Sequence, residues 1–165
     1  MNKKLMYKFY DEINSVDIKD LNFSENLIIC GIRIWFNFDN KNLDPLPRLR
    51  NVFSCNKVEE ITIPFNKIMK LTASYCFSQN GKFESCCRIL SFGELSFLNA
   101  IAYIQYREDQ EGHNLISFWL PKFVLLDAFK QCTKIASGLE KAGYFLPVRH
   151  FSKYRTKEFF KPTLH

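Results

Sequence analysis

The pair Asn80-Gly81 is the strongest turn signal in the sequence. The secondary structure of the segments on either side of it determines which fold the chain can adopt. The preceding segment, Asn66–Ser78, fits two patterns. Its apolar residues recur every three or four positions, as in a helix, but its last part, "LTASYCFS", alternates as a strand does. The turn therefore either closes a β-hairpin or joins two helices.

A helical interpretation places the turn in a longer order of elements over residues 58–106. The segment "EITIP" has strand composition, Pro64 ends it, and the apolar residues after Gly81 trace a helical stripe to Tyr106. Strand, helix, Asn-Gly-Lys turn and helix, in this order, resemble the ribbon-helix-helix family of DNA-binding proteins, the Arc and MetJ repressor type. The resemblance covers residues 58–106 only.

The resemblance implies a dimer in which strands from two subunits pair and enter the major groove of DNA. Glu60 and Thr62 would then face the bases, and Lys82 and Ser85 would lie where the turn and the next helix bind a phosphate. Glu60 departs from the family, because a carboxylate can only accept a hydrogen bond from a base.

The hairpin interpretation leads to a different fold, a β-rich barrel or sandwich with a C-terminal helix. It also leads to a different function, because such a chain would hold a protein partner or an anionic small ligand. "LPRLRN" and "ILSFGEL" resemble motifs of PilZ nucleotide-binding barrels, although Ile89 and Glu94 stand where that family has an acidic residue and a second glycine. Both interpretations stay open at this point.

Patterns elsewhere predict two further strands and one long helix. Asn26–Phe38 alternates apolar and polar residues like a half-buried strand, in which Gly31 marks a bulge or a close approach to the backbone. "LISFWLP" is predicted as a strand and "REDQEGHN" before it as a polar turn. In Lys122–Gly143 an apolar stripe of helical period predicts a helix that ends at Gly143, with the stripe serving core packing or a dimer contact.

We therefore expect an α+β fold whose centre is a dimeric ribbon-helix-helix-like unit. The predicted parts are an N-terminal strand element (1–55), the ribbon-helix-helix-like unit (56–107), a strand with the long helix (108–147), and a basic tail (148–165).

The last 18 residues carry most of the net positive charge of the chain, which is +6. These residues include five basic side chains, among them Arg149, Lys153, Arg155 and Lys157, and one acidic side chain. The basic residues alternate with aromatic residues. Such a segment either pairs with phosphates and adds salt-sensitive affinity for nucleic acid, or forms a solvated helix whose rings dock on the body.

No pattern indicates catalysis. The six cysteines include no CxxC pair, the three histidines lack zinc-ligand spacing, and no phosphate-binding glycine loop is present. We expect no enzyme activity and no cofactor. No apolar stretch is long enough for a membrane span and no secretory signal is evident, so we expect a cytoplasmic protein without a membrane partner.

The function predicted from these observations is that of a sequence-specific DNA-binding transcriptional regulator that acts as a homodimer on double-stranded DNA. The alternative is a non-enzymatic β-rich interaction protein. The residues predicted to bind DNA are Glu60, Thr62, Lys82, Ser85, Arg149, Lys153, Arg155 and Lys157.

Overall fold

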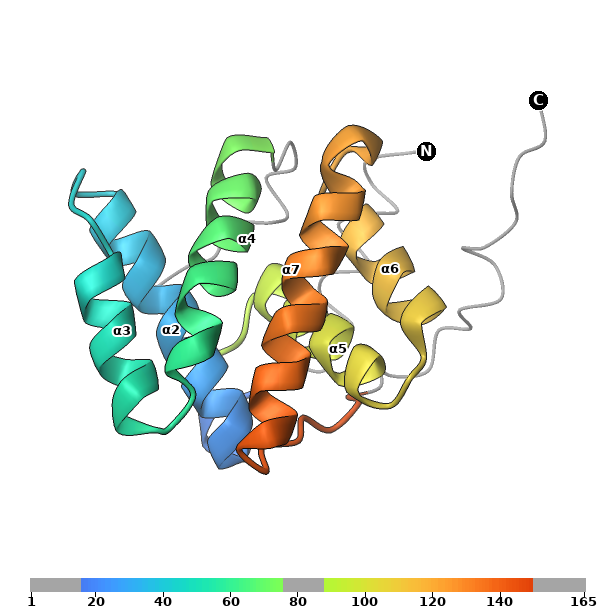
Figure 1. Ribbon diagram of the computed structural model, residues 1–165, viewed down its shortest axis with the longest axis horizontal. Helices are drawn as coiled ribbons and strands as arrows, with labels where there is room; N and C mark the ends of the chain where they lie inside the picture. Colours follow the sequence, from blue (N-terminus) through green and yellow to red (C-terminus); the bar gives the residue numbers. More distant parts are fainter. Residues whose placement is uncertain (1–15, 76–87, 150–165) are drawn as a thin grey trace. The chain divides into compact units, whose positions relative to one another are not determined.

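The part of the chain that the computed structural model describes, residues 16–75 and 88–149, is mainly helical (Figure 1). These residues contain six α-helices, two short 3₁₀ helices and no strand, so the predicted α+β fold and the β-rich alternative are both wrong. The elements are η1 (Ile18–Asp20), α2 (Phe23–Asp39), α3 (Leu46–Cys55), η2 (Glu59–Ile61), α4 (Thr62–Tyr75), α5 (Phe92–Gln105), α6 (Asp109–Ser117) and α7 (Lys122–Lys141).

The helices of Val16–Val148 pack as one compact unit. In Figure 1, α3, α4 and α7 stand side by side in front of α2 and α5, and α6 lies beside α7. Helices α4 and α7 are antiparallel, because Ile61 just before α4 meets Gly138 near the end of α7, while the Tyr75 ring lies 5.2 Å from that of Phe123. The only strand-like pairing among the described residues is an isolated bridge between Asp17 and Ile89.

The predicted strand Asn26–Phe38 lies inside helix α2. A capping box starts this helix, in which the Asn22 side chain accepts a hydrogen bond from the Glu25 amide and the Glu25 carboxylate accepts one from the Asn22 amide. The alternation that predicted a strand does not match the burial, because Trp35 is buried although it lies on the supposedly polar side. A segment this rich in apolar residues fits the alternation of a strand as well as the three- to four-residue spacing of a helix. The capping box then favours the helix.

The two other predicted strands are also helical or irregular. Residues 58–63 form the 3₁₀ helix η2 and the start of α4, so no ribbon strand exists there. "LISFWLP" covers the end of α6 and the turn before α7, and the predicted polar turn "REDQEGHN" contains the first six of the nine residues of α6. Asp109 and Glu111 stabilise that helix start, because acidic side chains interact favourably with the positive end of a helix.

Three helical predictions are confirmed. Residues 66–75 belong to α4, which excludes a β-strand from this part of the proposed hairpin. The stripe predicted after Gly81 is helical from Phe92 as α5, whereas residues 88–91 form no helix, and α7 covers the long helix predicted from Lys122. Gly143 follows α7 with φ of 78° and ends it as predicted. Asn80-Gly81 itself lies outside the described residues.

The core contains the buried apolar residues of α7 and the rings of Phe53, Phe65 and Phe97, which meet edge to face. Leu125, Cys132, Ala136 and Leu139 are buried, so the stripe predicted from the sequence serves core packing. The predicted close approach at Gly31 is confirmed, although within a helix: a Cβ there would lie 2.9 Å from Phe53 Cζ and 3.0 Å from Phe65 Cζ. Larger side chains at this position of α2 would push α3 and α4 away.

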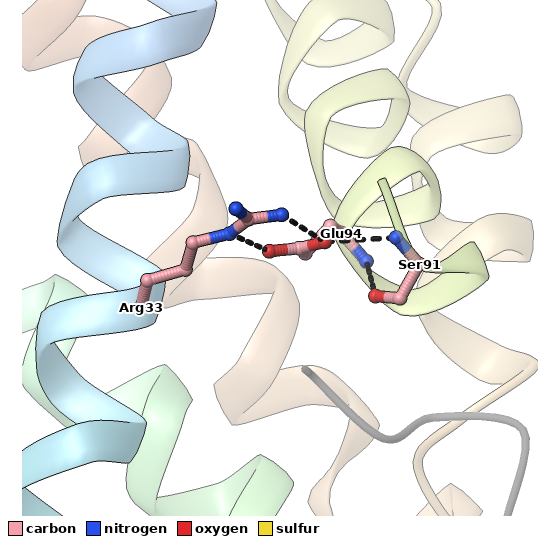
Figure 2. Close-up of polar contacts among 3 residues, drawn as sticks. All are labelled: Arg33, Ser91 and Glu94. Carbon is pink, nitrogen blue, oxygen red and sulfur yellow. Dashed lines mark hydrogen bonds and ion pairs between the residues drawn. The ribbon is translucent and has the colours of Figure 1, made fainter. Parts of the chain in front are cut away.

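Figure 2 shows the buried ion pair that joins α2 to α5. Arg33 Nε lies 2.7 Å from Glu94 Oε1, and a second guanidinium nitrogen of Arg33 donates to Glu94 Oε2 at 3.2 Å. The same carboxylate accepts a hydrogen bond from the Ser91 amide at 2.8 Å, while the Ser91 hydroxyl accepts one from the Glu94 amide. Glu94 thus starts α5 and attaches it to α2.

Replacing Glu94 by Ala should lower the free energy of unfolding by about 3–5 kcal/mol, because a largely buried Arg33 would lose its charge partner and α5 its capping box. Urea denaturation of the full chain measures this change. Arg50→Ala is the matched control, since the exposed Arg50–Glu59 pair at 3.7 Å should contribute less than about 1 kcal/mol. Equal losses in the two variants would contradict the central role of Glu94.

Replacing Gly138 by Ala should also destabilise the chain, although alanine favours a helix over glycine by about 1 kcal/mol. A Cβ at Gly138 would overlap Cγ2 of Ile61, and overpacking typically costs about 1–3 kcal/mol. The double variant with Ile61→Ala should lose less stability than the two single variants added together. Additive losses in urea denaturation would show that the two residues do not press on each other.

Candidate protein-binding surface

The two residues that were predicted to contact DNA bases have different environments in the structure. Thr62 is only 2% exposed at the start of α4, and its hydroxyl has no hydrogen-bond partner among the described residues. Glu60 is exposed in η2, where its carboxylate lies 3.3 Å from the Lys141 ammonium of α7. Neither residue belongs to a strand, so the predicted ribbon is wrong and these side chains share no DNA-facing side.

The other predicted DNA contacts are mostly outside the described part of the chain. Lys82 and Ser85 lie between residues 76 and 87, and Lys153, Arg155 and Lys157 lie beyond residue 149. Arg149 is the last described residue. These positions stay predictions.

The described residues show little reactive chemistry. No group of His, Cys, Asp or Glu side chains within residues 16–75 and 88–149 is arranged to hold a metal ion. Burial raises the pKa of the Cys132 thiol well above its usual range, and a buried, protonated thiol is a poor nucleophile. None of the helices in these residues has the length and apolarity of a membrane span.

The most exposed apolar side chains among the described residues lie on α7. Phe123 is 73% exposed and Leu126 is 80% exposed, although they belong to the same apolar run as the buried Leu125. Four consecutive apolar residues, 123–126, cover more of a helix circumference than the core can contact. The apolar side chains that the core cannot contact, Phe123 and Leu126, are therefore exposed at the start of α7.

Lysines continue this apolar surface along α7. Lys130 and Lys134 follow Leu126 at four-residue intervals, so the four side chains Phe123, Leu126, Lys130 and Lys134 lie on one side of the helix and are called the α7 stripe. Within the described residues, neither lysine forms an ion pair.

The neighbouring helix α4 adds further positive charge. Lys67 and Lys70 are exposed there, and no described residue forms an ion pair with either of them. Helix α4 carries no acidic residue at all, and Asp127 of α7 bonds to Gln131 at 2.8 Å. Lysines of α4 and α7 therefore give this surface a positive charge, and Phe123 and Leu126 form its apolar part.

Helix α6, on the other side of α7, carries the opposite charge. Glu108 and Glu111 are exposed without an ion pair to any described residue, and Leu115 and Phe118 follow them at four- and three-residue intervals. These four residues, from the N-cap to the C-cap of the helix, are called the α6 stripe. Burial, and then the nearby carboxylates of Glu111 and Glu108, raise the pKa of the Tyr103 hydroxyl.

Sequence reasoning missed both stripes, and it missed the α6 stripe because it assigned residues 107–121 to a turn and a strand. A signal for the α7 stripe was present, however. The stripe of buried residues that correctly predicted α7 accounts for Leu125 but not for Phe123 and Leu126, which lie outside its period. Apolar residues left over by a helical pattern mark an exposed apolar surface.

Comparisons with known proteins add no family assignment. No protein-family model, no curated protein and no solved structure matches this chain.

Replacing Leu126 by Ser should change the free energy of unfolding by no more than about 0.5 kcal/mol, because its side chain is already in solvent. The matched variant Leu125→Ser should lose about 3 kcal/mol or more, since it leaves a cavity in the core. Urea denaturation compares the two adjacent positions. A large loss at Leu126 would mean that its side chain is covered within the chain.

Proposed function

We propose that this chain is a non-enzymatic interaction protein that binds an acidic, amphipathic helix of a protein partner on the α7 stripe. The observation that carries the proposal is the combination of two strongly exposed apolar side chains, Phe123 and Leu126, with lysines on the same side of one helix that pair with no acid among the described residues. An apolar centre bordered by charge is the usual composition of a protein-binding surface.

The apolar side chains favour a protein partner over DNA. Fully burying a Phe or Leu side chain contributes about 1.5–3 kcal/mol each, and a helix with apolar residues between its acids would bury both. A phosphate backbone offers phosphate oxygens to the lysines but no comparable contact to Phe123 and Leu126. The proposed partner therefore uses the whole stripe, and duplex DNA only its basic half.

Binding to duplex DNA stays a prediction, and the helical fold changes what it would rest on. The ribbon that was expected to recognise bases does not exist, so base contacts through Glu60 and Thr62 have no support. The basic surface of α4 and α7 would supply sequence-independent affinity that falls as the salt concentration rises. A DNA duplex is therefore one of the probes in the binding experiment below.

Fluorescence anisotropy of the full chain with three labelled probes tests the proposal. The probes are a synthetic helical peptide with Glu and Leu on one side in an Ala and Gln background, the same peptide with each Glu replaced by Lys, and a duplex DNA of 20 base pairs. Anionic vesicles that contain phosphatidylserine are a fourth probe, measured by co-sedimentation. We expect the acidic peptide alone to bind with an affinity that depends on the α7 stripe.

Two variants locate the binding site. Phe123→Ser with Leu126→Ser, and separately Lys130→Glu with Lys134→Glu, should each weaken peptide binding by about 30-fold or more, since roughly 2 kcal/mol is lost in each case. The control variant Lys41→Glu with Leu43→Ser makes the same kinds of change on exposed residues away from the stripe and should leave binding unchanged.

Three results would overturn the proposal. Binding of DNA or of vesicles but not of the acidic peptide would assign the surface to those ligands. Equal loss in the control variant would show that the stripe is not the site. Absence of binding to every probe would remove the proposed function altogether.

A further inference from the structure

The α6 stripe lies on the side of α6 that faces away from α7. The ring of His113 lies 5.7 Å from that of Phe129 in α7, so His113 marks the side of α6 that meets α7. Glu111 and Leu115 are each two positions from His113, which places them about 160° around the helix from it. The α6 stripe is therefore a second surface, separate from the α7 stripe.

The surface around the α6 stripe is acidic, although the chain as a whole is basic. Residues 92–121, which include α5 and α6, contain four acidic residues and a single basic one, Arg107. Arg107 is already paired with a carboxylate of α7 at 3.0 Å. No described basic residue forms an ion pair with Glu108, Asp109 or Glu111. The start of α6 thus presents negative charge that the described residues do not neutralise.

Tyr103 of α5 places an aromatic ring beside these acids. Its side chain is half-buried. Burial, and then the carboxylates of Glu111 and Glu108, raise the pKa of its hydroxyl, so both acids lie near it. A guanidinium at such a place can pair with a carboxylate and stack on the ring at the same time.

Apolar side chains complete the surface toward the end of α6. Leu115 is half-buried and Phe118 is 52% exposed. The acids at the start of the helix repel the phosphates of nucleic acids and of anionic membranes. A small cation would pair with the acids but leave Phe118 uncovered. A ligand that carries both positive charge and apolar side chains covers the whole stripe.

We infer that the α6 stripe binds a basic, amphipathic helix of another protein. An antiparallel partner fits best, because its basic residues then lie near its own C-terminus, where positive charge stabilises a helix, and meet the acids at the start of α6. The α6 stripe has intervals of three, four and three positions. Taken from its N-terminus, the matching helix has two apolar residues three positions apart, and four positions later two basic residues three apart.

This inference goes beyond the proposed function and does not depend on it. The α6 stripe faces away from α7, so a helix bound there leaves the α7 stripe accessible. Together with the proposed function, the inference makes the chain a bridge between an acidic and a basic helix.

Fluorescence anisotropy of the full chain with a labelled peptide tests the inference. The probe is a synthetic helical peptide with the pattern Leu-x-x-Leu-x-x-x-Arg-x-x-Arg in an Ala and Gln background. The control peptide has the same composition but carries its arginines on the side opposite its leucines. We expect the probe to bind at least about tenfold more tightly than the control, because only the probe presents charge and apolar area to α6 together.

Charge-neutral variants locate the acidic part of the site. Glu108→Gln with Glu111→Gln removes two carboxylates and nearly keeps the side-chain shape, so it should weaken probe binding by about tenfold. Asp109→Asn is the matched control. It also removes an acid from the first turn of α6, but off the stripe, and should change the affinity by less than about twofold.

A variant of the apolar part gives an independent measurement. Phe118→Ser should weaken probe binding by about tenfold or more, because the partner loses the ring that it covers. Leu43→Ser changes a residue that is 53% exposed between α2 and α3, and it should leave binding unchanged. Circular dichroism checks that each variant is folded.

Four results would overturn the inference. They are absence of probe binding, equal binding of probe and control peptides, equal loss in the Asp109→Asn variant, and a second copy as the occupant. The last is measured by sedimentation equilibrium at about 10–100 μM. Self-association of the natural chain that is lost in Glu108→Gln with Glu111→Gln would assign the α6 stripe to a second copy.

Exchanging variants and peptides separates this inference from the proposed function. Phe123→Ser with Leu126→Ser should weaken binding of the acidic peptide and leave the probe unaffected, whereas Glu108→Gln with Glu111→Gln should do the reverse. Any binding of the lysine peptide, the control for the α7 stripe, should likewise depend on Glu108 and Glu111. Loss of one activity with retention of the other would remove only the corresponding proposal.

Discussion

The ion pair between Arg33 and Glu94 is the interaction on which the arrangement of the helices depends. Taking two charges out of water costs several kcal/mol for each ion, and only close geometry with further hydrogen bonds compensates for that cost. Here the Glu94 carboxylate satisfies the Arg33 guanidinium in α2 and the backbone amide of Ser91 at the start of α5. The pair thus specifies both where α5 begins and which helix it lies against.

The outer surface of α7 follows from this arrangement. Helix α5 contacts α6 and α7, and α4 covers the other flank of α7, so the inward side of α7 is filled by its neighbours. Gly138 permits the close approach of Ile61, and Gly31 permits that of Phe53 and Phe65. Four consecutive apolar residues at the start of α7 cover more of the helix than this inward side, so Phe123 and Leu126 stay in solvent.

Local signals predicted some helices and missed others for identifiable reasons. The prediction of α7 succeeded because its buried residues repeat with a single helical period and Gly143 ends it. The prediction for Asn26–Phe38 failed because apolar residues occur at nearly every position, so that alternation and helical spacing are both present. The capping boxes at Asn22–Glu25 and Ser91–Glu94 were readable in the sequence and would have favoured helices at both places.

The sequence by itself determined the apolar side of α7, the glycine that ends it, and an excess of apolar residues at its beginning. These properties depend on neighbours along the chain and on the period of the helix. Only the tertiary structure decided that the excess is exposed and that Glu108 and Glu111 lie on the adjacent helix. Exposure and adjacency depend on which helices pack together, and the contacts that decide this, such as that between Arg33 and Glu94, join residues far apart in the sequence.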